Sequence, residues 1–180
     1  MGKVHDGIDG SLADWIRRQH VFFVATASSG ADGTVNVSPK GTDGTLVVID
    51  AQRCAYLDLT GSGIETVAHL RDNGRITLMW CAFEGPPRIV RVHGTGRVVT
   101  PDDDSWDELS GAFPPHRGAR AIIEVTAQRV SDSCGYSVPY MDFSAERTRL
   151  DDWVEARSDE DLVQYRERKN ARSIDGLPGL

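Results

Sequence analysis

The sequence predicts an α+β protein that is mainly β, in which a small closed antiparallel barrel carries helices on its outside. Three observations support this prediction. About six to seven short runs of strand-forming residues are separated by turn formers. Three or four amphipathic or charged segments between and after these runs are typical of helices. Gly94 and Gly96 interrupt the longest strand pattern, which indicates a bulge or bend of the kind that barrels need at their corners. The alternative interpretation of this G-x-G as a cofactor motif is weak, because the pattern lies within a strand.

The elements of the N-terminal part follow from apolar patterns and turn residues. A first helix is expected over residues 11–20, with Ser11 as its N-cap. The next strands are expected over residues 21–28, 34–40, 45–50 and 53–59, joined as an antiparallel meander. The first of these strands is densely apolar and is expected to be central. Pro39 marks the end of the second strand or a bulge.

The chain is organised around residues 56–80, which indicate a strand, a tight loop, a helix and a second strand. The loop is TGSG at residues 60–63, and the helix is expected over residues 64–72. A helix start preceded by glycines favours a phosphate, because its first N–H groups are unpaired and the helix dipole attracts an anion. In the alternative interpretation, Ser62 and Glu65 form a capping box that closes the helix without any ligand. The loop has neither the Lys-Ser/Thr of a Walker A loop nor the G-x-G-x-x-G of a Rossmann turn.

The C-terminal half continues with strands and then changes character. Strands are expected over residues 75–80, 88–100 and 121–130, a polar helix after Pro101, and two charged helices over 146–157 and 160–172. The aromatic segment 133–143 is full of turn formers and is expected to pack against another surface. The tail 173–180 is expected to dock onto the body or a partner. These segments divide the chain into an N-terminal helix (1–20), a barrel domain (21–130) and a helical extension (131–180) that packs on the barrel or the dimer partner.

Composition argues against several classes of protein. The 180 residues carry a net charge of −7 and a pI near 5.2, which disfavours nucleic acid or an anionic membrane as the main partner. No apolar run approaches the ~20 residues of a membrane helix, and no secretory signal is expected. Three widely spaced cysteines are typical of a cytoplasmic protein with buried thiols. The five histidines form no metal-binding spacing, His69 and His93 are expected to be structural, and no G-x-S-x-G elbow supports a catalytic triad.

Four short motifs occur in a fixed order along the chain. They are SPKG at 38–41, LTGSGIET at 59–66, CGYSVP at 134–139 and SIDGLP at 173–178, and they accompany the strand patterns VFFVATAS, TVNVSPKG and RIVRVHGTGRVV. Each motif is weak alone, but their joint order is fairly specific and spans nearly the whole chain. On these residues the chain resembles the pyridoxamine 5′-phosphate oxidase family of FMN-binding split barrels.

The resemblance implies a six-stranded Greek-key split barrel and a homodimer with two FMN molecules in clefts between the subunits. It implies that one strand lines the flavin ring with Asn36, Val37, Ser38 and Lys40. It implies that the strand–helix junction holds the phosphate with Thr60, Ser62, Gly63 and Thr66. Arg88 matches an arginine expected at the phosphate or ring. Tyr136 is expected to form an aromatic wall beside the flavin or substrate, or else a plug at the dimer interface.

Two departures from the family pattern limit what the resemblance implies. The vitamin-making oxidases hold the phosphate with an Arg-Lys pair, and the matching positions here are Glu65 and Thr66. The positive charge is then expected from Lys40, Arg88, Arg75 or the other subunit. The tail also lacks the Arg-x-His pattern that grips pyridoxine phosphate, so true pyridoxamine-phosphate oxidase activity is not expected.

The expected function is that of an FMN-dependent oxidoreductase acting on a small molecule, with NAD(P)H as one candidate reductant. The flavin would carry the hydride chemistry, which explains why no acid–base constellation is found, and Lys40 would stabilise the reduced, anionic flavin. Three alternatives remain: a flavin-binding sensor without turnover, or a split barrel that binds deazaflavin or haem. Haem is disfavoured because no histidine lies in an obvious ligand loop, and deazaflavin because the chain is acidic.

Overall fold

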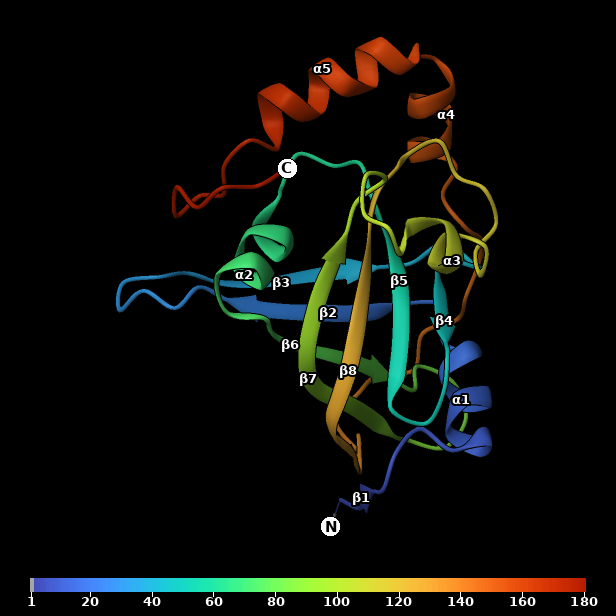
Figure 1. Cartoon of the computed structure of the whole chain (residues 1–180). Coiled ribbons are helices and arrows are strands. Elements are labelled where there is room, and N and C mark those ends of the chain that lie inside the picture. The colour runs from blue at the N-terminus through green and yellow to red at the C-terminus, as the bar shows by residue number, and fades with distance from the viewer. Residues whose placement is uncertain (1) are drawn as a thin grey trace.

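The central feature of the computed structural model, which describes residues 2–180, is one curled antiparallel sheet with helices at its ends (Figure 1). Its strands are β1 (Val4–His5), β2 (Phe22–Ala27), β3 (Val35–Lys40), β4 (Leu46–Val48), β5 (Arg53–Leu59), β6 (Arg75–Cys81), β7 (Ile89–Val99) and β8 (Ala119–Ser133). The helices are α1 (Gly10–Arg17), α2 (Glu65–Asn73), α3 (Trp106–Ser110), α4 (Arg149–Glu155) and α5 (Asp159–Lys169). The strands lie in the order β3-β2-β6-β7-β8-β5-β4, and β1 pairs with β8.

The predicted α+β class with an antiparallel sheet is confirmed, and each of the expected strands is present. The meander is wrong, because β3 and β4 follow one another in the chain but lie at opposite edges of the sheet. The closed ring is also wrong: within residues 2–180 these two edge strands do not pair, and the sheet is an open half-barrel. The edge position of β3 explains why Pro39, which has no N–H to donate, lies within the strand. The sequence patterns miss β1, whose two residues are too few to show an alternation.

The main core fills the concave side of this sheet. In β2 the residues alternate, so that Phe22 and Val24 are buried while Phe23 and Ala25 face outward. Helix α1 adds Leu12 and Ile16 to the same core. Each fully buried side chain of this size contributes roughly 1.5–3 kcal/mol. The segment before residue 21 is therefore part of the barrel's core.

A bulge bends the long β7–β8 ribbon, as the sequence predicts. The pairing register shifts between His93 and Gly94. A Cβ atom at Gly94 would overlap the carbonyl oxygen of Thr126, so only glycine fits there. Beyond the bend, the outward side of β5 and β8 forms a second apolar cluster under α3, to which Trp106 and Leu109 contribute.

Both ends of the chain dock onto the sheet. Helix α1 begins after Asp9, whose carboxylate accepts hydrogen bonds from the backbone of Leu12 and from the hydroxyl of Ser11, so the prediction of Ser11 as the N-cap is wrong. The predicted docking of the tail is confirmed, because the carboxylate of Asp175 accepts from the backbone and hydroxyl of Thr34. Within residues 2–180 no helix has the length and apolarity needed to cross a bilayer.

The segment 133–143 is exposed on the single chain, so its packing against another surface, such as a dimer partner, stays a prediction. Tyr136 is 82% exposed, and Phe143 is also exposed although its ring stacks on His20. The aromatic side chains are thus largely uncovered by their own chain.

The prediction of buried thiols is correct for Cys54 and wrong for Cys134, which is exposed. Burial raises the pKa of the Cys54 thiol to about 12.

Candidate functional site

The start of α2 has no side-chain cap. Its N-cap is Ile64, which makes no capping hydrogen bond through its side chain, and Gly74 ends the helix in the left-handed conformation as predicted. The capping box of Ser62 and Glu65 is therefore wrong, because Ser62 lies two residues before the cap. The carboxylate of Glu65 instead accepts a hydrogen bond of 3.3 Å from the backbone N–H of Ile174 in the tail. Among residues 2–180, no side chain accepts a hydrogen bond from the first N–H groups of α2.

Thr60 is buried in the loop before α2, and its donors are already used. Its backbone N–H and its hydroxyl both donate to the carbonyl oxygen of Gly118, at 2.7 and 2.8 Å. Its hydroxyl oxygen accepts from Nε of Arg166 at 3.0 Å. Thr60 thus fixes the loop, whereas the predicted site residues Ser62 and Gly63 are exposed.

Strand β3 brings two predicted residues, Asn36 and Ser38, toward Thr66 of α2. The carboxamide of Asn36 donates to the hydroxyl of Thr66 at 3.1 Å, and the hydroxyl of Ser38 donates to the Asn36 oxygen at 3.2 Å. Val37 lies on the opposite face of the strand and is 59% exposed. The structure therefore joins β3 to the helix start through its side chains, and Val37 can reach a ligand on that side only through its backbone.

Lys40 belongs to a charge cluster that the sequence analysis did not anticipate. Its ammonium nitrogen lies 2.8 Å from Oδ1 of Asp58, and Nε of Arg120 lies 2.8 Å from Oδ2 of the same carboxylate. Asp58 is completely buried. Burial alone would raise the pKa of Asp58, but the charges of Lys40 and then Arg120 outweigh it and hold that pKa below its ordinary value. An acidic residue within the apolar pattern YLDL was the signal that could have revealed this cluster.

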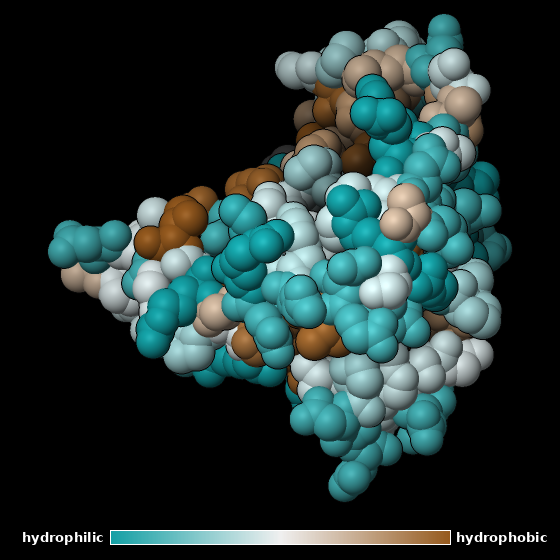
Figure 2. Space-filling view, turned by 90° about the horizontal axis from the view of Figure 1, so that it is seen from above, coloured by the Kyte–Doolittle hydropathy of each residue, from teal (hydrophilic) through white to brown (hydrophobic). Residues whose placement is uncertain are grey.

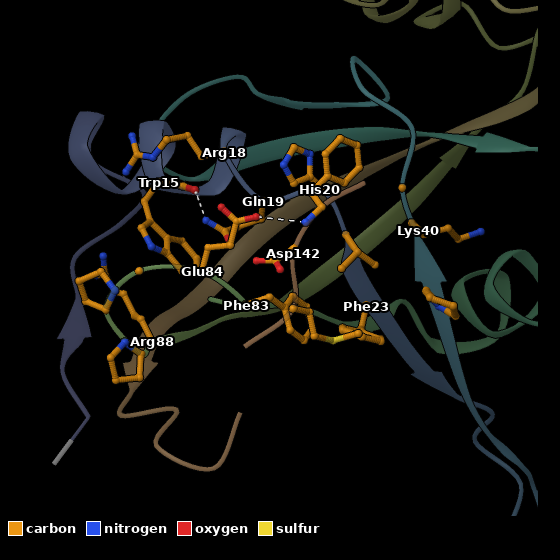
Figure 3. A pocket seen from close by; sticks show the side chains of 18 of the residues that line it. Trp15, Arg18, Gln19, His20, Phe23, Lys40, Phe83, Glu84, Arg88 and Asp142 are labelled. Atoms are coloured by element: carbon orange, nitrogen blue, oxygen red, sulfur yellow. Dashed lines mark hydrogen bonds between the residues drawn. The ribbon is translucent and has the colours of Figure 1, made fainter. Parts of the chain in front are cut away.

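A cleft of about 1790 Å³ lies beside this cluster, between α1, the β6–β7 connection and the 133–147 segment. It collects three of the predicted residues, Lys40, Arg88 and Tyr136. Figure 3 shows Lys40 at one end of the cleft and Arg88 at the other. The guanidinium of Arg88 donates to Asp132 at 2.8 Å and lies 5.3 Å from the ring centre of Trp15.

The predicted site residues thus fall into two groups. Asn36, Ser38 and Thr66 contact one another near the start of α2, whereas Arg88 and Tyr136 line the cleft. Lys40 connects the groups, because it stands on β3 and also lines the cleft. Within residues 2–180 no cluster of histidine, cysteine and acidic side chains could hold a metal ion.

Comparison with known proteins identifies the family. The family model for pyridoxamine 5′-phosphate oxidase matches residues 8–134, well over half of the chain. The pyridoxamine 5′-phosphate oxidase family protein ustO of Aspergillus flavus is 37% identical over 197 residues, which cover 98% of this chain and 77% of ustO.

Comparison with solved structures gives two alignments, of which the first supports similarity in fold. HupZ from Group A Streptococcus aligns with a TM-score of 0.52 and 22% identity, over 68% of this chain and 91% of HupZ. The FAD-binding protein of Mycobacterium smegmatis aligns with a TM-score of 0.48 and 14% identity, over 73% of this chain and 96% of its own. The family model and the identity to ustO, together with a curled antiparallel sheet of the split-barrel type, show that the chain belongs to the pyridoxamine 5′-phosphate oxidase family.

Proposed function

We propose that this protein binds FMN and acts as an oxidoreductase on a small molecule, with the flavin in a cleft that two copies of the chain share. The observation that carries the proposal is the contact between β3 and the start of α2. There the carboxamide of Asn36 meets the hydroxyl of Thr66, directly beside a helix end that has no side-chain cap. In a member of this family, the arrangement supplies polar groups for the ring along the strand and N–H donors for a phosphate at the helix.

Two further features of these residues support FMN as the ligand. Bound FMN supplies the hydride transfer. The protein supplies orientation through β3, and a positive charge through Lys40, whose ammonium is fixed by the buried Asp58 at the edge of the cleft. A fixed cation at this place stabilises negative charge that develops on a bound ring, because it needs no reorganisation during the reaction.

A second copy of the chain is the proposed cover for the outer face of β3. Val35 is 73% exposed there and Val37 lies on the same side, although β3 is an unprotected edge strand. In Figure 2 the β2–β3 hairpin and the tail project as one arm that carries hydrophobic patches. Because the cleft residues and the helix-end residues are separated on one chain, a twofold contact along this edge would bring both groups to each flavin.

The visible absorption spectrum of the purified protein, recorded after addition of FMN and desalting, tests the cofactor. Retained flavin peaks at about one FMN per chain are expected. A folded protein that keeps no flavin would overturn the proposal. Turnover is tested separately, by mixing the loaded protein with NAD(P)H and an electron acceptor. Oxidation at the background rate would reject the enzyme in favour of a flavin-binding module.

Light scattering tests the shared cleft. The loaded protein is expected to be a dimer, and Val35→Asp is expected to shift it toward monomer without unfolding it, since Val35 is exposed on one chain. Val163→Asp, at an exposed position of α5, is the matched control. A wild-type monomer that retains FMN would refute the shared cleft.

A further inference from the structure

Two arginines from distant parts of the chain hold the turn that precedes α2. A terminal nitrogen of Arg120, at the start of β8, donates to the carbonyl oxygen of Gly61 at 3.2 Å. Nε of Arg166, on α5, donates to the hydroxyl oxygen of Thr60 at 3.0 Å. Both guanidinium groups therefore reach the loop at residues 60–61, just before the uncapped helix.

Positive charge exceeds negative charge around this loop. Asp58 is the one carboxylate bound by Arg120, and it is already shared with Lys40. Arg166 makes no salt bridge within residues 2–180, and its acceptors are neutral oxygens of Thr60 and of the backbone. Lys40 and Arg120 thus share the carboxylate of Asp58, and Arg166 has no carboxylate bound to it among the described residues. Half-buried cations without an anion are costly.

Each guanidinium also keeps an unused donor. Among the described residues, Nη2 of Arg120 and Nη1 of Arg166 have no protein hydrogen-bond partner and are available to a ligand. Burial and then the charge of Arg120 lower the pKa of Arg166, which shows that the two groups are electrostatically close. Converging guanidinium donors with uncompensated charge are the arrangement that binds phosphate.

Glu65 adds one negative charge beside Gly63 at the helix start, where it offsets part of this positive charge. The backbone N–H of Ile174 binds its carboxylate, so the tail holds the side chain in place. The tail itself is fixed to the β2–β3 hairpin by the bonds between Asp175 and Thr34. The tail thus holds Glu65, which occupies the position of a phosphate ligand in the family pattern.

We propose that Arg120 and Arg166 bind the phosphate group of the flavin and replace the Arg-Lys pair whose positions Glu65 and Thr66 occupy here. This assignment rests on the proposed FMN function. It gives the C-terminal extension a direct role in the site, because α5 carries Arg166. Free inorganic phosphate and other phosphate esters present the same chemistry, so the test must separate them from FMN.

Fluorescence titration of FMN and of riboflavin, which lacks the phosphate, provides the test. Wild-type protein is expected to prefer FMN. Arg166→Gln is expected to lower the affinity for FMN by about tenfold or more, because it removes a charge-assisted hydrogen bond to the phosphate. The affinity for riboflavin is expected to stay unchanged. Arg166→Lys, which keeps the charge without the planar fork, should fall between the two. Arg168→Gln, at an exposed position of the same helix, is the control and should change neither affinity.

Three outcomes would overturn the assignment. Equal weakening of FMN and riboflavin by both Arg166 variants would show a purely structural role. An unchanged preference for FMN in folded Arg166→Gln would remove this residue from the phosphate, while the FMN function would stand. In the third outcome, the protein binds neither flavin, but inorganic phosphate raises the melting temperature of wild type and not that of Arg166→Gln. This result would reject both the flavin assignment and the proposed function.

Discussion

Two carboxylates in this protein each contact two side chains with nitrogen donors, and they differ in burial: Asp58 contacts Lys40 and Arg120, whereas Asp132 contacts Arg88 and His5. Asp58 contacts Lys40 and Arg120 at 2.8 Å inside the half-barrel, and its side chain is 0% exposed. Asp132 contacts Arg88 at 2.8 Å at the far end of the cleft, and its side chain is 21% exposed.

The difference shows why similar geometry does not imply similar energy. An exposed ion pair contributes about 0–1 kcal/mol, because water solvates each partner when the other is removed. Removal of one partner from a buried cluster leaves an uncompensated charge, which costs about 3–5 kcal/mol. The cluster around Asp58 is therefore expected to be essential to the fold, and the cluster around Asp132 replaceable.

The largest expected effect is that of Asp58→Asn. The substitution preserves shape but leaves Lys40 and Arg120 without their anion, so the free energy of unfolding should fall by about 3–5 kcal/mol. Urea unfolding followed by circular dichroism measures it. Asp132→Asn is the matched control, and a loss equal to that of the control would refute the role of burial.

The next effect concerns flavin affinity at the two ends of the cleft. Lys40→Ala should weaken the binding free energy of FMN by about 1–3 kcal/mol, which is the range for a charged hydrogen bond to a ligand. Arg88→Ala is expected to have the same effect if its guanidinium contacts the flavin, although it is already bound to Asp132. Titration by flavin fluorescence measures both changes, and unchanged affinity removes the substituted residue from the site.

The strands of this fold could be predicted because their signals are local. Apolar alternation, glycines and turn residues located each long strand and the bulge at Gly94. The order of strands could not be predicted in the same way, because β5 pairs with β8 across the whole of α2, β6 and β7. Pairing between distant strands depends on packing that no short window of sequence contains.

The residues of the candidate site divide in the same way, into those predictable from local sequence and those that depend on distant contacts. The loop at residues 60–63 was found from its glycines and hydroxyls, and Lys40 from its motif. The contact of Arg166 with Thr60 was not predicted, because it joins residues 106 positions apart and an arginine in a charged helix resembles a solvated one. The capping box failed for a local reason: the helix begins at Glu65 with Ile64 as its N-cap, two residues after the Ser62 that the capping box requires as the cap.

A smaller effect is expected at the partly exposed cluster around Asp132. Asp132→Asn should lower the free energy of unfolding by about 1–2.5 kcal/mol at neutral pH, because the lowered pKa of Asp132 stabilises the fold while water that reaches Arg88 replaces part of the lost contact. Urea unfolding at pH 7 measures this change. A loss as large as that predicted for Asp58→Asn would show that the partial exposure of Asp132 does not weaken its role.

The smallest effect is a pH dependence that isolates Asp132. The backbone N–H of Lys3, followed by His5 and Arg88, overcomes partial burial and lowers the pKa of Asp132 from 3.8 to about 2. A carboxyl whose pKa is lower in the folded state stabilises the fold above its unfolded pKa, and this contribution is lost as the pH falls through the folded pKa. The stability difference between wild type and Asp132→Asn should therefore be constant above about pH 5 and shrink between about pH 4 and pH 2. Asp58 is present in both proteins, so its own titration cancels in this comparison. A difference that stays constant down to pH 2 would show that the ionised carboxylate at residue 132 does not contribute to stability.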